Sequence, residues 1–346
     1  MTVRTPLNQP IVLTGCGWVT PLAAGTLDDV LACLRQAVSA PVLVHGCWTV
    51  PESLRDQGPE LSDELTKDHG GWLAGLAFVH ARRAAAWREG AFQPERVGLV
   101  LGCALAGQPG MIGFAREVRQ QTARFVSPLH FPQTVGNYVA GALARGFHLR
   151  GPNLTLASGE ASGLDALAEA FELLGAGLAD VVLAGAVAEC PPNLASGLAG
   201  SGVVLSEGAC LFVLERAESA AARGAVPLAT MAGYTRSPAT EFQAALRPAL
   251  LSCAARGRVG AVFIEQWVGR SPGTTGVAAV AAAIGAARGQ PVPVLDAADP
   301  VSVSVRPVAL DDLRNDDGTV RAFVQAATDG GHMTTLELAI PARTSM

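Results

Sequence analysis

Charged residues are scarce in this chain. Asp, Glu, Lys and Arg make up 16% of its 346 residues, against about 25% in ordinary globular domains, whereas hydrophobic residues make up 49%. Such a composition implies a large buried surface, and we expect part of it to be buried against another chain. The net charge of −5 is not accompanied by any basic cluster, which argues against nucleic acid as a partner.

The sequence also lacks the patterns of disulfide-rich, zinc-binding and membrane-spanning proteins. Its seven cysteines include no Cys-x-x-Cys pair and stand at positions 16, 33, 47, 103, 190, 210 and 253. The six histidines form no His-Glu-x-x-His motif, so we predict neither a disulfide framework nor a metal site. No apolar run reaches the ~18 residues of a membrane span, and no signal-peptide core follows the N-terminus. A reduced, cytoplasmic location is therefore expected.

Short apolar runs alternate with helical patterns along the chain. Strands are predicted at 10–22, 96–104, 179–189, 260–268 and 291–296, a strand running into a helix at 206–225, and a closing hairpin at 320–327 and 334–340. Helices are predicted at 26–38, 71–90, 110–123, 134–147, 163–177 and 273–289, and residues 39–71 are expected to be irregular. Apolar strands that alternate with helices predict an α/β fold with a mostly parallel sheet. The alternation occurs twice, which predicts an N-terminal half, 1–224, and a shortened C-terminal half, 225–346.

Residues 156–167, LASGEASGLDAL, carry two glycines and several small residues directly before an apolar helical pattern. This predicts a sharp strand-to-helix turn of the kind that displays a nucleophile, and the displayed residue is Glu160. A helix N-terminus stabilises a carboxylate by typically ~0.3–1 kcal/mol and so lowers its pKa, whereas a general base needs a pKa nearer neutrality. Two roles stay open for Glu160: a base or nucleophile, and a helix cap or interface ion pair. The second is favoured.

Other catalytic and cofactor motifs are absent or incomplete. No Gly-x-Ser-x-Gly elbow occurs. TGCGWVT at 14–20 lacks the third glycine of a dinucleotide-binding loop, and GLAGSGVVLSEGA at 197–209 lacks the Lys-Ser/Thr ending of a phosphate loop. We therefore predict no cofactor.

Four segments, in order along the chain, resemble the beta-ketoacyl synthases of fatty acid and polyketide assembly. They are IVLTGCGWVTPLAAGTLDDV at 11–30, the block that begins FPQTVGNYVAG at 131–189, LSEGACLFVLERAESAAARGA at 205–225, and DGGHMTTLEL at 329–338. The resemblance runs from about residue 10 to residue 340. It implies that family's thiolase-like fold, in which two related halves pack as layers α-β-α-β-α.

The resemblance breaks down at the positions that carry the family's chemistry. Glu160 stands where active members have the acyl-accepting cysteine, and Trp267 falls near the first catalytic histidine. Residues 295–305 contain neither the lysine nor the second histidine expected there, and Thr328 and Asp329 stand at the aromatic gate. Because the family's decarboxylation needs the histidines as donors to the enolate oxygen, we predict no catalytic residue in this chain.

The resemblance is closest to the chain-length factor of type II polyketide synthases, the subunit that lacks the cysteine. It implies a heterodimer with a catalytic ketosynthase that elongates a polyketide on an acyl carrier protein, and the short second half and low aromatic content favour a highly reduced polyene. It places Thr155, Leu156, Ala157 and Glu160 at the subunit interface.

The same resemblance places a helix at the end of the partner's tunnel. Met111, Phe114 and Val118 follow i, i+3 and i+4 steps on this helix, and with Phe131 they would set the product length, although they could equally pack the chain's own core. Alternative functions are a stand-alone acyltransferase or hydrolase, a decarboxylating priming enzyme that uses Glu160, and a homodimeric scaffold that docks a carrier protein.

Overall fold

The computed structural model describes most of the first two thirds of the chain and separate segments of the rest. The described residues are 10–36, 43–44, 47–57, 61–105, 107–122, 124–191, 197, 205–238, 273–290, 292–296, 299–306, 319–327 and 332–341. The predicted strand at 260–268, Trp267, Thr328 and Asp329 lie outside them.

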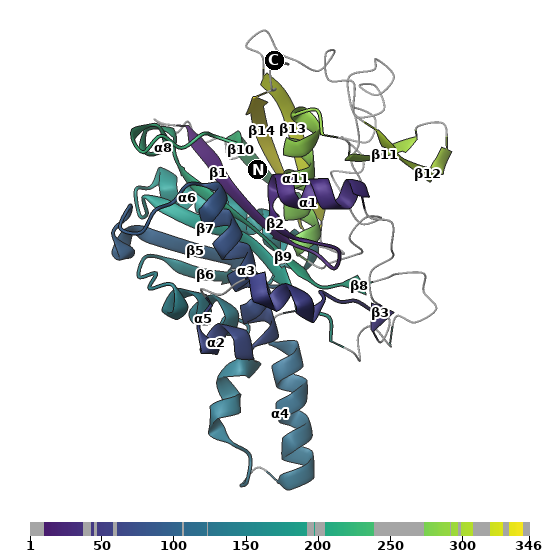
Figure 1. Ribbon diagram of the computed structural model, residues 1–346. Coiled ribbons are helices and arrows are strands. Elements are labelled where there is room, and N and C mark those ends of the chain that lie inside the picture. Colours follow the sequence, from purple (N-terminus) through teal and green to yellow (C-terminus); the bar gives the residue numbers. More distant parts are fainter. Residues whose placement is uncertain are drawn as a thin grey trace.

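A nine-stranded sheet forms the centre of the molecule (Figure 1). Its order is β13 (Thr319–Ala327), β14 (His332–Pro341), β10 (Ala229–Pro238), β1 (Ile11–Val19), β9 (Gly208–Arg216), β7 (Val181–Ala188), β5 (Val97–Gly102) and β6 (Asn153–Leu156), with β2 (Ala24–Thr26) paired to β1. Strands from beyond residue 225 thus continue the sheet that the first half begins.

The prediction of a mostly parallel sheet is wrong for the described strand pairs. β5 runs parallel to β6 and β7, but β9 is antiparallel to both β1 and β7, and β10, β13 and β14 are joined by antiparallel pairs. The apolar runs indicated burial on both faces correctly. Burial comes from the covering helices rather than from strand direction, so the pattern could not distinguish the two arrangements.

Helices cover both faces of the sheet and create two hydrophobic cores. On one face lie α3 (His69–Ala84) and α5 (Tyr138–Gly146), and on the other α1 (Leu27–Gln36), α6 (Ser162–Gly175) and α11 (Thr274–Ala287). Side chains of one strand alternate between the cores, as Leu99 and Leu101 do against Val100. The predicted helices at 26–38, 163–177 and 273–289 are confirmed.

Two glycines of β1 let α3 approach the sheet closely. A Cβ atom on Gly17 would lie 1.9 Å from the Ala77 carbonyl oxygen, and one on Gly15 would lie 2.2 Å from that of Ala81. The predicted helix at 71–90 ends earlier, at Ala84, because the chain turns there through Ala86, whose φ is +49°.

Shorter elements complete the described part of the fold. They are β3 (Leu43–Val44), β4 (Cys47–Trp48), η1 (Glu52–Gln57), α2 (Asp63–Lys67), η2 (Pro94–Arg96), β8 (Leu205–Ser206), α8 (Ala217–Ala222), β11 (Val292–Asp296) and β12 (Asp299–Arg306). Short helices and strands therefore lie within the stretch at 39–71 that was expected to be irregular. No helix among the described residues is long and apolar enough to cross a membrane.

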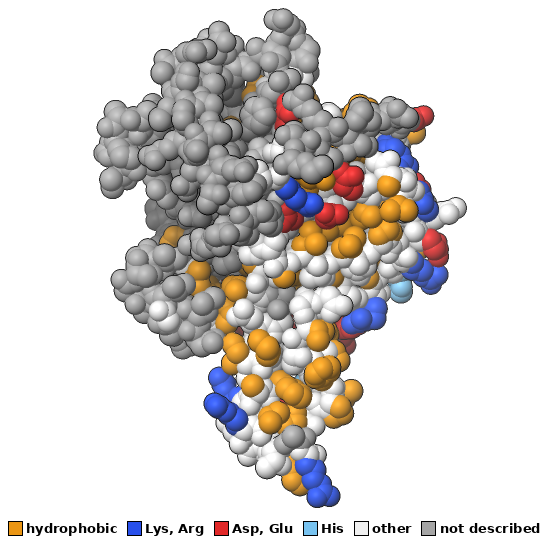
Figure 2. All heavy atoms as spheres, turned by 180° about the vertical axis from the view of Figure 1, so that it is seen from behind, with side chains coloured by type: hydrophobic (Ala, Val, Ile, Leu, Met, Phe, Trp, Pro, Cys, Tyr) orange, Lys and Arg blue, Asp and Glu red, His pale blue; other side chains and the backbone are white. Residues whose placement is uncertain are grey.

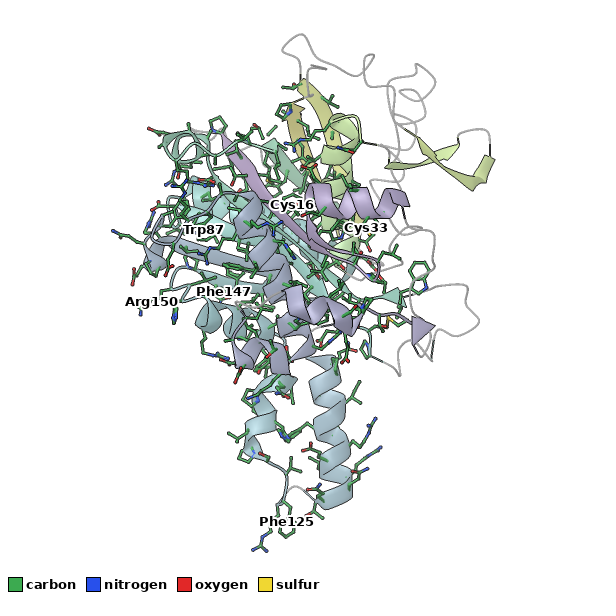
Figure 3. All side chains as sticks on the ribbon, viewed as in Figure 1. Cys16, Cys33, Trp87, Phe125, Phe147 and Arg150 are labelled. Carbon is green, nitrogen blue, oxygen red and sulfur yellow. A yellow bond between two sulfur atoms is a disulfide. The ribbon has the colours of Figure 1, made fainter. Side chains whose placement is uncertain are left out.

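A helical arm projects from the body of the molecule (Figure 1). It consists of α4 (Gln108–Gln121) and η3 (Pro128–Thr134), which contact each other, and Phe125 lies at its tip (Figure 3). The predicted helix at 134–147 begins later, at Tyr138, and residues 128–134 before it form a 3-10 helix that contains Pro128 and Pro132.

Candidate functional site

The strand-to-helix turn predicted around Glu160 is present. β6 ends at Leu156, a single 3-10 turn, η4 (Gly159–Ala161), follows, and α6 begins at Ser162. Gly159 has φ +61°, a left-handed conformation that suits glycine, and its carbonyl accepts a 2.6 Å hydrogen bond from Ser162 Oγ. Glu160 stands half-buried on this turn.

Glycines allow other elements to enclose the turn. A Cβ atom on Gly102 of β5 would lie 2.6 Å from the Ser162 carbonyl oxygen. One on Gly163 would lie 2.3 Å from both the Gly273 oxygen and Val277 Cγ2. The turn is therefore held between β5 and the start of α11, with no room for extra side-chain atoms.

A buried carboxylate ties the turn to strands from beyond residue 225. Asp165, in the first turn of α6, accepts hydrogen bonds from Ser158 Oγ at 2.5 Å, Thr334 Oγ1 at 2.5 Å and Arg236 Nε at 3.2 Å. Arg236 also donates to Glu169 Oε1 at 2.9 Å. The sequence did not predict this network because its members are far apart in the chain, although an aspartate inside an apolar helical run was a usable signal.

A pocket of about 310 Å³ separates the arm from the body. Its walls combine polar side chains of the body with residues of the arm, and among them are Asp68, His69, Tyr138, Glu189, Gly110, Phe114, Glu117 and His130. Across the arm, His130 Nδ1 lies 3.0 Å from Glu117 Oε2. Of the predicted tunnel residues, Phe114 lines this pocket, with the ring of Phe131 edge-on at 6.0 Å, whereas Met111 is 51% exposed on the arm.

The arm and the edge of the sheet present apolar side chains to solvent. Figure 2 shows hydrophobic side chains gathered over the arm, and the most exposed are Met111, Phe125, Leu129, Phe131 and Val135. β6 is the edge strand beside β5, and no described strand pairs with its other side. Leu154 on β6 is 37% exposed, and Thr155 Oγ1 is buried without a hydrogen-bond partner within the described residues. Of the other predicted interface residues, Leu156 is half-buried and Ala157 exposed.

Comparison with known proteins identifies the segment that contains this turn and most of the pocket lining. Residues 73–197 match the family model for the beta-ketoacyl synthase N-terminal domain. This segment is a beta-ketoacyl synthase domain. It includes α4, the turn at Glu160, and β5, β6 and β7.

Two bacterial synthases match a larger part of the chain, at 26% and 33% identity. A 3-oxoacyl-[acyl-carrier-protein] synthase 2 of Rhizobium meliloti is 26% identical over 265 residues, which are 65% of this chain and 63% of the relative. The granaticin polyketide putative beta-ketoacyl synthase 1 of Streptomyces violaceoruber is 33% identical over 273 residues, which are 67% of this chain and 65% of the relative. The match thus spans less than two thirds of the length of either relative.

Solved synthase structures match this chain over almost its whole length. The ishigamide ketosynthase/chain length factor is similar with a TM-score of 0.73 at 23% identity, over 96% of this chain and 100% of that one. A type II PKS acyl-carrier protein in complex with its ketosynthase bound to the hexaketide gives a TM-score of 0.73 at 17% identity, over 96% and 99%. The predicted thiolase-like α/β fold is confirmed.

None of the described cysteines stands at the nucleophile position, which Glu160 occupies. Cys103 and Cys210 are buried, and burial raises the pKa of each thiol well above its usual range. Cys47 and Cys190 are joined in a disulfide, so the expectation of cysteines without pairing is wrong for these two. They are 143 residues apart in sequence, a separation at which spacing carries no signal of pairing. Among the described residues, no group of three or more His, Cys, Asp or Glu side chains could hold a metal ion.

Carboxylates gather on the pocket wall at the N-terminus of α3. Asp68 Oδ2 accepts the Gly71 N–H at 2.7 Å, and Glu189 Oε1 accepts the Gly70 N–H at 3.1 Å. Burial raises the pKa of both carboxyls, that of Glu189 to about 7, and the charge of Asp68 adds to the effect on Glu189. At neutral pH Glu189 is therefore poised between its two protonation states.

Glu189→Gln should remove a pH dependence of stability. Because the pKa of Glu189 rises from 4.5 to about 7 on folding, the folded protein holds this proton more tightly than the unfolded chain does. The contribution of this proton to the free energy of unfolding is therefore lost as pH rises from about 4.5 to 7. Glutamine keeps an acceptor for the Gly70 N–H without the charge. In urea unfolding, we expect the variant to gain up to ~3 kcal/mol over the wild type between pH 5 and pH 8.

The exposed Glu95 provides the matched control for this measurement. Its side chain is 60% exposed, so Glu95→Gln should leave the pH profile of stability parallel to that of the wild type. If Glu189→Gln and the wild type also gave parallel profiles, Glu189 would not bind its proton more tightly in the folded protein.

Proposed function

We propose that this chain is a non-catalytic, chain-length-factor-like subunit that pairs with an active ketosynthase in the cytoplasm and helps to elongate a polyketide on an acyl carrier protein. The observation that supports this most directly is Glu160. It stands on an intact synthase turn, where the synthase reaction needs a thiolate that can carry the chain as a thioester. A carboxylate in that position cannot form a thioester.

Two surfaces support the pairing. The side of β6 with which no described strand pairs offers backbone groups for strand addition, and the arm exposes Phe125, Leu129 and Phe131. Large exposed apolar side chains gathered on one element are characteristic of protein–protein interfaces. One structure with the same fold is described as a ketosynthase/chain length factor, and another as a ketosynthase in complex with an acyl-carrier protein.

The arm also supports a role in product length. Phe114 lies on the pocket wall beside Phe131, so its bulk limits the room between arm and body. We assign Phe114 as the main length-setting residue, with Met111, Val118 and Phe131 on the same arm as its neighbours. Helical spacing alone did not distinguish Phe114 from Met111 and Val118.

A stand-alone acyltransferase is less well supported. Such an enzyme needs a reactive thiolate, a hydroxyl with a base, or an activated carboxylate. The buried thiols of Cys103 and Cys210 hold their protons tightly. Cys33, the exposed free thiol among the described residues, lies on α1 (Figure 3), whereas the turn lies at the start of α6.

Co-expression with a cysteine-bearing ketosynthase tests the proposal. We expect a heterodimer on size exclusion, and Leu154→Asp should weaken its association at least ~10-fold because it places a charge on the free strand edge. Val226→Asp is the matched control, since Val226 is 77% exposed on a loop after α8. In the same complex Glu160→Ala should leave the elongation rate unchanged, and Phe114→Ala should lengthen the product.

Three results would contradict the proposal. The first is turnover of an acyl thioester by this chain purified alone. The second is loss of elongation in an intact complex that carries Glu160→Ala. The third is a stable homodimer that does not exchange with any ketosynthase.

A further inference from the structure

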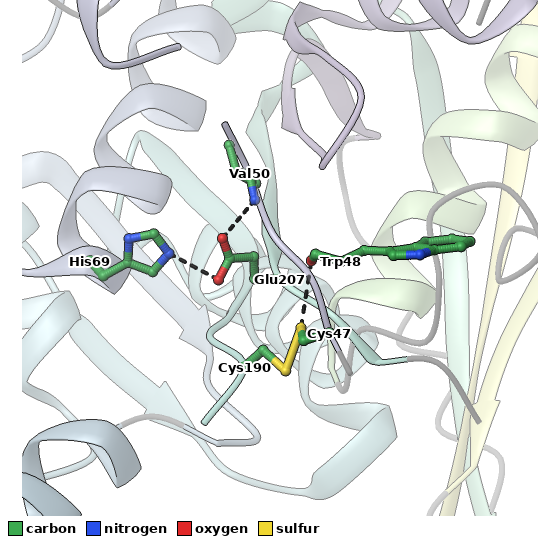
Figure 4. Close-up of a disulfide and its surroundings, with 6 residues drawn as sticks. All are labelled: Cys47, Trp48, Val50, His69, Cys190 and Glu207. Carbon is green, nitrogen blue, oxygen red and sulfur yellow. Dashed lines mark hydrogen bonds and ion pairs between the residues drawn. A yellow bond between two sulfur atoms is a disulfide. The ribbon is translucent and has the colours of Figure 1, made fainter. Parts of the chain in front are cut away.

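The Cys47–Cys190 disulfide joins two segments of the chain, and each segment is connected to the start of α3 through a carboxylate. Cys47 lies on β4, and Cys190 directly follows Glu189, with a Cα–Cα distance of 6.4 Å. Cys47 is 2% exposed, and Cys190 is half-buried. Figure 4 shows the pair beside Glu207 and His69.

Glu207 connects the Cys47 segment to α3. Its Oε1 accepts the Val50 N–H at 2.6 Å, and its own N–H donates to the Trp48 carbonyl at 3.1 Å. Its Oε2 lies 3.0 Å from His69 Nε2, on the first residue of α3. The segment that contains Cys47 is therefore linked to His69 through one buried carboxylate.

Glu189 connects the Cys190 segment to the same helix end. It accepts the N–H of Gly70, the second residue of α3, and lines the pocket together with Asp68 and His69. A closed circuit results: the disulfide, Glu189, the first turn of α3, Glu207 and β4. Asp68 caps the same helix end, and the charges of Asp68 and Glu207 both act on Glu189. The covalent bond opposes the repulsion between Glu189 and Glu207.

We propose that the Cys47–Cys190 disulfide is a reversible redox clasp on the N-terminus of α3 and on the pocket wall beside the arm. A dithiol reductant attacks the sulfur of Cys190, the less buried of the two cysteines, and Cys47 leaves as a thiolate that takes up a proton. The second thiol of the reductant then attacks the mixed disulfide. The products are two cysteine thiols in the protein and one oxidised dithiol, and a disulfide oxidant reverses the exchange.

Opening the clasp leaves Glu207 and Glu189 to hold the first turn of α3 by hydrogen bonds alone. The cross-link closes a loop of 143 residues, and removing a link of that span restores a large conformational entropy to the unfolded chain. The first effect acts on the pocket wall formed by Asp68, His69 and Glu189, and the second lowers the stability of the whole fold. The inference concerns this chain alone and does not depend on the proposed partner.

Thiol mapping and hydrogen exchange test the clasp on the full chain. Protein purified without reductant should give a disulfide-linked Cys47–Cys190 peptide, and dithiothreitol should release both thiols for alkylation. The N–H groups of Gly70, Gly71 and Trp72 should then exchange ~10-fold faster, and the melting temperature should fall by ~5 °C or more. Oxidised dithiothreitol should restore both properties.

Variants distinguish the clasp from other effects of reductant. In Cys47→Ser/Cys190→Ser, exchange at the start of α3 should match that of the reduced wild type and should no longer respond to dithiothreitol. Cys33→Ser, which removes an exposed free thiol, should respond as the wild type does. Absence of the linked peptide, or unchanged exchange at Gly70–Trp72 after reduction of the wild type, would overturn the proposal, and neither result needs a variant that folds.

Discussion

Gly163→Ala should destabilise the protein by ~3 kcal/mol or more, the overpacking cost of a site that cannot relax. The new Cβ atom would lie 2.3 Å from the Gly273 carbonyl oxygen and from Val277 Cγ2, and 3.1 Å from Ala186 Cβ. These atoms belong to β7 and to the beginning of α11, which are packed in the same core. Removing these close contacts therefore requires a backbone shift at the turn that displays Glu160. Urea unfolding followed by circular dichroism measures the change.

Gly113→Ala is the control for this substitution. Gly113 lies within α4, and a Cβ atom there would meet nothing within 4 Å. Alanine should stabilise that helix by ~0.5–1 kcal/mol. Opposite signs for two identical substitutions would show that the space around Gly163, rather than the backbone freedom of glycine, sets the effect. A cost below 1 kcal/mol at Gly163 would mean that α11 can move away from the turn.

Arg223→Met should cost ~3–5 kcal/mol, because it leaves a buried charge without its partner. Arg223 pairs with Glu215, whose side chain is 0% exposed, and donates to the Ala85 carbonyl oxygen at 2.6 Å. Glu215 would keep the hydrogen bond from Thr14 Oγ1 at 2.7 Å, which cannot neutralise a carboxylate. Chemical denaturation of the single variant gives the loss of stability directly.

An exposed pair in the same protein provides the comparison. Arg150 and Glu95 have side chains 67% and 60% exposed, so Arg150→Met should cost ~0–1 kcal/mol. The double variant Arg223→Met/Glu215→Leu should recover part of the loss, because it removes the uncompensated charge as well. A double variant less stable than Arg223→Met would show that Glu215 contributes through Thr14 rather than through Arg223.

Local patterns of the sequence predicted most helices and strands correctly. The periodicity of 163–177 and the apolar run of 179–189 gave α6 and β7 within a few residues, because burial imposes a period of 3.6 or a continuous apolar stretch. Strand direction and neighbours carry no such signal. β9 lies between β1 and β7 and antiparallel to both, and its pairing with β1 joins residues about 200 positions apart.

The sequence likewise predicted the local part of the candidate site but not its long-range contacts. The turn at Glu160 was predictable because its glycines and small residues satisfy a local geometric need. The network of Asp165 with Arg236 and Thr334 was not, since it joins residues 71 and 169 positions apart. Helical spacing placed Met111 and Phe114 on one face of α4, yet Phe114 lines the pocket while Met111 is exposed, because the arm projects from the body and α4 faces the pocket with Phe114.

The composition of β6 has a consequence for how the protein is produced in the cell. Its four residues, Asn153–Leu156, include no charged side chain and no proline, so the strand lacks the usual features that prevent one sheet edge from adding to another. If the proposed partner covers this edge, molecules made in excess over that partner would add to one another and aggregate. The proposed pairing therefore calls for matched synthesis of the two chains, as translation from a single transcript would provide.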